Sequence, residues 1–151
     1  MHKDYEEFLR LLNYHRVNYA IVGAYALVSY TEPRFTGDLD ILIESTEENA
    51  RKILNVLKDF GFGLLELKAS DFLEKDSVVQ LGYKPVRIDI LTSLTGISWK
   101  EVWKNKVEGI FGSQKVYFIG KADLIKNKKA TNRPKDLLDL RMLEETQDDK
   151  S

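Results

Sequence analysis

The spacing of apolar residues along the chain predicts a domain built from alternating helices and strands. Residues 4–14 carry Tyr5, Phe8, Leu9 and Leu12 on one helical face. Short apolar runs predict strands at 19–22 and 39–43, with a buried helix at 24–30 and a loop at 34–37 between them. Ser45, followed three residues later by Glu48, predicts a capping box that opens an amphipathic helix, which we expect to run to Phe60 and stop at Gly61.

The second half of the chain continues this alternation. Strands are predicted at 64–67 and 78–81, and the second is joined through 82–85 to the alternating run 86–91, as in a hairpin. A short helix at 99–104, a strand at 115–118 and two last helices, at 122–129 and from Pro134 onward, complete the pattern. We therefore expect an α/β or α+β fold, with a mixed β-sheet flanked by helices and with helices at the C-terminus. Residues 1–146 are expected to form a single domain and 147–151 a polar tail.

Composition narrows the chemistry that this domain can perform. The formal net charge of -1 gives no global field that would attract nucleic acid or membrane. With no cysteine and only two histidines, the chain lacks the ligands of zinc and thiol sites, so oxygen ligands remain. No apolar run is long enough to span a membrane and no secretory signal opens the sequence, so a soluble cytoplasmic protein is expected.

Two carboxylates open the predicted strand at 39–43. Residues i and i+2 of a strand share a face, so Asp38 and Asp40 project together. Mg²⁺ is bound through carboxylates together with substrate phosphates, and the turn at Gly23, which leads into a helix, offers backbone N–H groups for those phosphates. The alternative for the acid pair is an acidic loop end, and for Gly23 it is a plain turn that needs a small residue.

A third acid turns the pair into a candidate site. In the run 86–91, Asp89 faces away from the apolar side and could join Asp38 and Asp40, although it could also be a solvent-facing strand residue. Three neighbouring carboxylates repel one another unless divalent cations neutralise them. Such a cluster suits in-line phosphoryl or nucleotidyl displacement, in which two ions stabilise the attacking and leaving oxygens.

These residues resemble the DNA polymerase β-like nucleotidyltransferase superfamily. The family pattern is similar to Val22-Gly23-Ala24, then Asp38-Leu39-Asp40-Ile41, then Asp89 on a later strand. Within the superfamily, the chain resembles small single-domain bacterial or archaeal members related to the AbiEii-type toxins, over about residues 17–143. The segments that carry this closer resemblance are Gly23 to Ala26 with Arg34-x-Thr36-x-Asp38-x-Asp40, Leu124-Ile125-x-x-Lys128, and Arg133-Pro134-Lys135-Asp136-x-x-Asp139-Leu140.

The resemblance implies a nucleotidyltransferase fold and a metal-dependent enzyme that transfers a nucleoside monophosphate from an NTP, with ATP the expected one, to a hydroxyl acceptor. Asp38, Asp40 and Asp89 would be the catalytic residues and would bind Mg²⁺ or Mn²⁺, with Asp89 also activating the acceptor hydroxyl. The nucleotide would contact Gly23, Ala24, Arg34, Thr36 and Lys128. Ala24 departs from the family's glycine or serine, so a hydroxyl contact to phosphate is lost.

The sequence leaves the acceptor open. A protein side chain, as in toxin–antitoxin relatives, a tRNA and a small molecule all remain, as do a non-catalytic nucleotide-binding or regulatory domain and an interaction module with a partner protein. Six basic residues between 121 and 135 are either a solvated face or an electrostatic wall for phosphates. They are Lys121, Lys126, Lys128, Lys129, Arg133 and Lys135.

Overall fold

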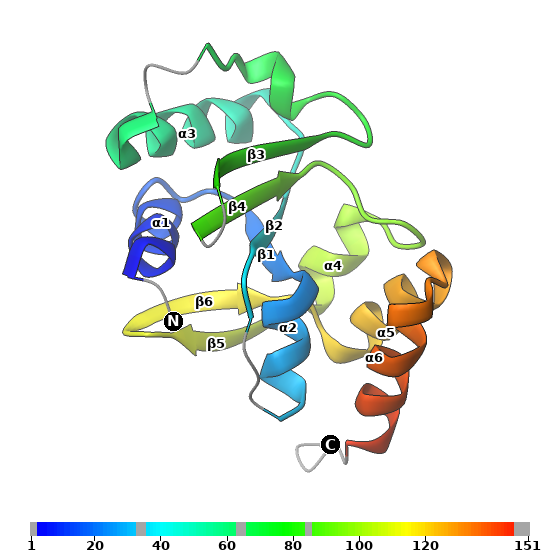
Figure 1. The fold of residues 1–151 in the computed structure, drawn as a ribbon. Coiled ribbons are helices and arrows are strands. Elements are labelled where there is room, and N and C mark those ends of the chain that lie inside the picture. Colours follow the sequence, from blue (N-terminus) through cyan, green and yellow to red (C-terminus); the bar gives the residue numbers. More distant parts are fainter. Residues whose placement is uncertain (1–2, 33–35, 63–65, 84–85, 147–151) are drawn as a thin grey trace.

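The computed structural model describes residues 3–32, 36–62, 66–83 and 86–146, which form one six-stranded mixed sheet flanked by helices (Figure 1). The strands are β1 (Tyr19–Val22), β2 (Leu39–Ile43), β3 (Val78–Tyr83), β4 (Val86–Leu91), β5 (Val107–Phe111) and β6 (Gln114–Phe118). Their order across the sheet is β3-β4-β2-β1-β6-β5. β2 runs parallel to β4 and antiparallel to β1, which places β2 and β4 side by side at the centre of this half of the sheet.

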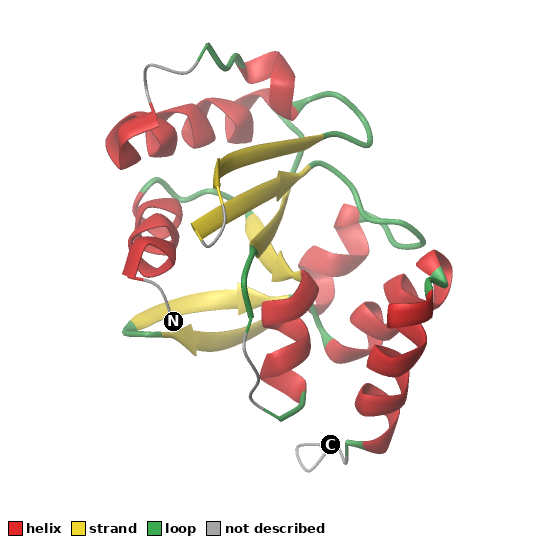
Figure 2. Ribbon diagram, in the orientation of Figure 1, coloured by secondary structure: helices red, strands yellow, loops and turns green. Residues whose placement is uncertain are grey.

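Helices lie on both sides of the strands (Figure 2). They are α1 (Lys3–Tyr14), α2 (Gly23–Tyr30), α3 (Glu47–Leu57), α4 (Trp99–Asn105), α5 (Lys121–Thr131) and α6 (Pro134–Glu145), with short turns η1 (Lys58–Phe62) and η2 (Ala69–Phe72). α1 and α3 pack against each other, whereas α5 and α6 form a pair that contacts α2 (Figure 1). No described helix is long and apolar enough to cross a membrane.

The apolar stripes of the sequence become the core. Tyr5, Phe8, Leu9 and Leu12 of α1 are all buried, as is every residue of β2 except Asp40. The tyrosine hydroxyl of Tyr5 donates to the carbonyl of Gly37 at 2.8 Å and accepts from the backbone N–H of Arg87 at 3.0 Å. One buried side chain thus ties the residue before Asp38 to the start of β4.

Most predicted elements are present, and three details differ. The cap of α3 is Thr46, whose hydroxyl accepts from the backbone N–H of Asn49, so the capping box expected at Ser45 is wrong by one residue. α3 ends at Leu57 rather than Phe60, and the turn η1 follows it. The strand predicted at 64–67 is not found at 66 and 67, and its first two residues lie outside the described part of the chain.

One strand was missing from the sequence prediction. β5 pairs with β6 in an antiparallel hairpin and forms one edge of the sheet. Its Val107 and Ile110 are exposed and Gly109 interrupts it, so it lacks the buried apolar pattern by which strands are recognised. The hairpin predicted between β3 and β4 is confirmed by their pairing from Val78 with Leu91 to Tyr83 with Val86.

Candidate active site

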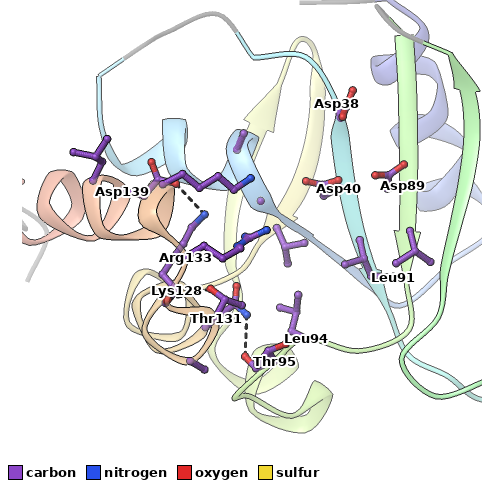
Figure 3. Close-up of a pocket in the computed structure, with 18 of the residues that line it drawn as sticks. Asp38, Asp40, Asp89, Leu91, Leu94, Thr95, Lys128, Thr131, Arg133 and Asp139 are labelled. Carbon is purple, nitrogen blue, oxygen red and sulfur yellow. Dashed lines mark hydrogen bonds and ion pairs between the residues drawn. The ribbon is translucent and has the colours of Figure 1, made fainter.

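Two of the three predicted catalytic acids lie side by side on the sheet. In the parallel pairing of β2 with β4, Asp40 stands opposite Asp89, and Figure 3 shows their carboxylates next to each other. Asp38 lies one residue before β2 and above Asp40 in the same view. The strand register therefore brings together acids that are about fifty residues apart in the sequence.

The turn after β1 closes around Asp40. Val22 pairs with Asp40 across β1 and β2, and Gly23 then begins α2 with φ +68°, a conformation that L side chains rarely adopt. A methyl group at Gly23 would overlap the carboxylate of Asp40. Glycine is thus required twice, by the backbone angle and by the contact with Asp40, and the start of α2 lies beside the acids.

The environment of Asp40 disfavours its charged form. Burial, followed by repulsion from Asp89 and Asp38, raises the pKa of Asp40 from 3.8 to about 6, although Arg87 and Lys135 act in the opposite direction. Within the described part of the chain, no hydrogen bond or ion pair reaches this carboxylate. A cation placed here would relieve this repulsion.

Arg87 lies between the other two acids. Its Nη2 atom is 2.8 Å from Oδ2 of Asp38 and 3.1 Å from Oδ2 of Asp89. Its Nε atom and the Oδ1 atom of Asp89 are buried and have no hydrogen-bond partner among the described residues. Arg87 was not among the predicted site residues, although its position two residues before Asp89 on the same strand face is the signal that would have found it.

The acids offer oxygen donors that suit Mg²⁺ or Mn²⁺. The Oδ1 atom of Asp89, which has no partner in the described part of the chain, and the raised pKa of Asp40 are both consistent with carboxylates that would be stabilised by a hard cation. With Arg87 between Asp38 and Asp89, however, no three acidic or histidine side chains of the described segments are arranged around a common metal position. The carboxylate oxygens are thus suitable ligands for a metal, but in this structure Arg87 pairs with two of the three acids.

A cavity of 1680 Å³ extends from the acids to the last two helices. Across it from Asp40 and Asp89 lie α5 and α6 (Figure 3), whose basic side chains line the cavity together with Gly23 and Ala24. These basic residues are Lys128, Arg133, Lys135 and Arg141. The cavity thus has acids on the sheet side and a mainly basic wall on the helices, where Asp139 and Glu145 also lie.

Lys128 takes part in a buried ion-pair cluster. Its Nζ atom is 3.0 Å from Oδ2 of Asp139 and 3.6 Å from Oδ1 of Asp136, and all three side chains are buried. Burial alone would raise the pKa of Asp136, but hydrogen bonds from the side chains of Arg133 and Thr131 and from the Arg133 backbone hold it well below its usual range. This cluster joins α5 to α6 and fixes the basic wall in front of the acids.

The remaining predicted nucleotide contacts fall in different places. Gly23, Ala24 and Lys128 line the cavity. Thr36 lies before Asp38, and its backbone carbonyl accepts a hydrogen bond of 3.1 Å from the hydroxyl of Tyr25; Thr36 is not among the residues that line the cavity. Arg34 lies outside the described residues.

Comparison with solved structures relates this architecture to known proteins. The lincosamide antibiotic adenylyltransferase LnuA, bound to lincomycin, matches 97% of this chain and 98% of its own with a TM-score of 0.60 at 15% identity. A candidate nucleotidyltransferase of Thermotoga maritima, TM1012, matches 92% of this chain and 89% of its own (TM-score 0.63, 15% identity). The antibiotic-resistance factor ANT(2'')-Ia matches 93% of this chain and 80% of its own (TM-score 0.60, 10% identity).

The chain has the nucleotidyltransferase fold. This confirms the fold expected from the sequence, over nearly the whole chain. At these identities the likeness concerns the fold. No family model and no curated protein matches the sequence.

Proposed function

We propose that this protein is a metal-dependent nucleotidyltransferase that moves a nucleoside monophosphate from an NTP to a hydroxyl group. The observation that carries the proposal is the placement of Asp40 beside Asp89, with the Gly23 turn packed against Asp40. The basic wall of α5 and α6 faces these acids across the cavity. The nucleotidyltransferase fold of the chain supports the same reaction class.

In this proposal each wall of the cavity has a separate task. The backbone N–H groups at the start of α2, at Gly23 and Ala24, and the cations Arg133 and Lys135 would bind the triphosphate. Asp38, Asp40 and Asp89 would hold Mg²⁺ or Mn²⁺, which when bound would neutralise the charge that develops on the attacking and leaving oxygens.

The reaction would proceed by in-line displacement. The acceptor hydroxyl oxygen forms a bond to the α-phosphorus, and the bond from that phosphorus to the bridging oxygen of pyrophosphate breaks. The hydroxyl proton passes to the carboxylate of Asp89, which stands opposite Asp40 on the sheet. Pyrophosphate leaves along the basic wall.

The cavity volume bears on the acceptor. A pocket for one small molecule has a volume of about 300 to 1,000 Å³, so 1680 Å³ accommodates a nucleotide together with a second small ligand. LnuA is an antibiotic adenylyltransferase with lincomycin bound, and it spans the same length of chain. We therefore propose a small hydroxyl compound as the first acceptor class to test and ATP as the first donor; the resemblance to AbiEii-type toxins makes a protein acceptor the next.

A second candidate function is nucleotide binding without turnover. Ala24 stands where the family pattern has glycine or serine, and Arg87 occupies two of the three acids. In that case the protein would bind NTP but form no product.

Incubation with each α-labelled NTP, Mn²⁺ or Mg²⁺ and a panel of acceptors tests both functions. Small hydroxyl compounds, tRNA, the protein itself and proteins encoded beside it form the panel. The enzymatic function is supported if an acceptor becomes labelled only when metal is present and if Asp89→Asn lowers the rate of labelling by a factor of about 10² to 10⁴. NTP binding with no labelled product from any acceptor supports the second function, and neither binding nor product contradicts both.

A further inference from the structure

The position of Arg87 places a positive charge inside the carboxylate site. One nitrogen of its guanidinium contacts both Asp38 and Asp89. The contact follows from the sheet. Arg87 and Asp89 are two residues apart and lie on the same face of β4, and Asp38 directly precedes the neighbouring strand β2. A charge at this point does what a divalent cation would do, since it neutralises two carboxylates at once.

The guanidinium contacts only some of the carboxylate oxygens of the site. It pairs with the Oδ2 atoms of Asp38 and Asp89. Among the described residues, Oδ1 of Asp89 is buried without a partner and no ion pair involves Asp40. The donors therefore fall into two groups. Asp40 and the free oxygen of Asp89 are open to a cation, and Asp38 is not.

The guanidinium and the backbone of Arg87 are held by separate contacts, so the side chain can move away from the acids while the backbone remains in β4. Among the described residues, the ion pairs with Asp38 and Asp89 are the contacts that hold the guanidinium, its Nε is unpartnered, and the side chain is 26% exposed. The backbone N–H of Arg87 is bound separately, by the hydroxyl of Tyr5. Withdrawal of the guanidinium would thus open Asp38 without disturbing the pairing of β4.

We propose that Arg87 is an internal cation that occupies one of two cation positions in the site and competes with a divalent ion for Asp38 and Asp89. A first ion binds through Asp40 and Asp89 in the presence of Arg87, and a second ion binds only when the guanidinium withdraws. This inference rests on the proposed function, because it concerns the same metal site.

Binding of Mn²⁺ alone tests this assignment without any catalysis. Isothermal titration at pH 8 compares the parent protein with Arg87→Gln. The matched control is Arg51→Gln, which removes an exposed arginine that pairs with Glu47 on α3. The positive charge of Arg87 repels an Mn²⁺ ion bound about 4 Å away. We therefore expect Arg87→Gln to bind Mn²⁺ at least about tenfold more tightly than the parent.

The number of bound ions is the second readout. We expect one ion per chain in the parent and in Arg51→Gln, and two in Arg87→Gln. Adding Asp38→Asn to Arg87→Gln should return the count to one, because Asp38 then no longer serves the second position. Equal or weaker Mn²⁺ binding by Arg87→Gln would overturn the assignment.

A second variant covers the case in which Arg87→Gln does not fold. Arg87→Met also removes the charge and keeps an unbranched side chain, so it should bind Mn²⁺ more tightly than the parent does. Unchanged affinity in Arg87→Met would overturn the assignment as well. If Arg87→Gln binds like the parent while labelled product still forms, only this inference fails; if no variant and no parent binds Mn²⁺, the proposed function fails with it.

Discussion

Replacing Asp40 with asparagine should stabilise the metal-free protein at neutral pH, because it removes a charge that the fold disfavours. The pKa of Asp40 is about 6 in the folded chain against 3.8 for a free side chain. Each unit of difference corresponds to about 1.4 kcal/mol, so ionised Asp40 lowers the free energy of unfolding by about 3 kcal/mol. For a chain of this length that equals a rise in melting temperature of about 6 to 12 °C in Asp40→Asn.

The stabilisation by Asp40→Asn should depend on pH in a defined direction. Because the pKa is raised in the folded state, the folded protein binds the proton more tightly than the unfolded one, and stability is lost as the pH rises from about 4 through about 6. The difference between Asp40→Asn and the parent should therefore be about 3 kcal/mol at pH 8 and only about 0.5 kcal/mol at pH 4. Addition of Mn²⁺ should raise the melting temperature of the parent and not that of the variant.

Thermal unfolding in EDTA at pH 4 and pH 8 measures these differences. The control Glu74→Gln replaces an exposed carboxylate after η2 and should change the melting temperature little at either pH. Asp40→Asn that is less stable than the parent at pH 8, or equally stabilised at both pH values, would refute the reasoning.

Further predictions concern the residues that shape the site. Gly23→Ala should destabilise the chain by more than about 1 kcal/mol and weaken Mn²⁺ binding, because its methyl group meets Asp40; chemical unfolding and titration measure both, and parent-like values would contradict the close contact. Lys128→Met should cost about 3 to 5 kcal/mol of unfolding free energy, since it removes the buried cation that pairs with Asp139 and Asp136 while Asp136 keeps Arg133, and a loss below 1 kcal/mol would show that the cluster does not hold α5 to α6. Tyr5→Phe should cost about 1 to 2 kcal/mol and broaden the NMR signals of the amides near Gly37 and Arg87, whereas unchanged signals would show that the hydroxyl is not needed there.

The sequence predicted the elements whose burial is regular. β2 has the predicted bounds because four of its five residues are buried, and α1 follows its apolar stripe. β5 was missed because an edge strand with exposed Val107 and Ile110 shows no such pattern. The cap of α3 was misplaced by one residue because Ser45 and Thr46 are both good caps, and only the backbone shows which one accepts from Asn49.

The acids of the candidate site were predicted from the sequence, whereas its ion pairs were not. The alternation of strand residues placed Asp38, Asp40 and Asp89 in one hypothesis, and the structure sets Asp40 opposite Asp89. Their roles stay predictions. The ion pair of Arg87 with Asp38 depends on the register between β2 and β4, and those of Lys128 depend on the packing of α5 against α6, so neither could be read from spacing along the chain. The contact of Arg87 with Asp89 follows from their spacing on one strand.

Diffraction from crystals soaked with Mn²⁺ and a non-hydrolysable ATP analogue tests the central claim most directly, because manganese is located by its anomalous signal. We expect a manganese peak at the carboxylates of Asp40 and Asp89, with the triphosphate between the Gly23 turn and the basic residues of α5 and α6. A triphosphate bound elsewhere, or no manganese at these carboxylates while the analogue is bound, would contradict it.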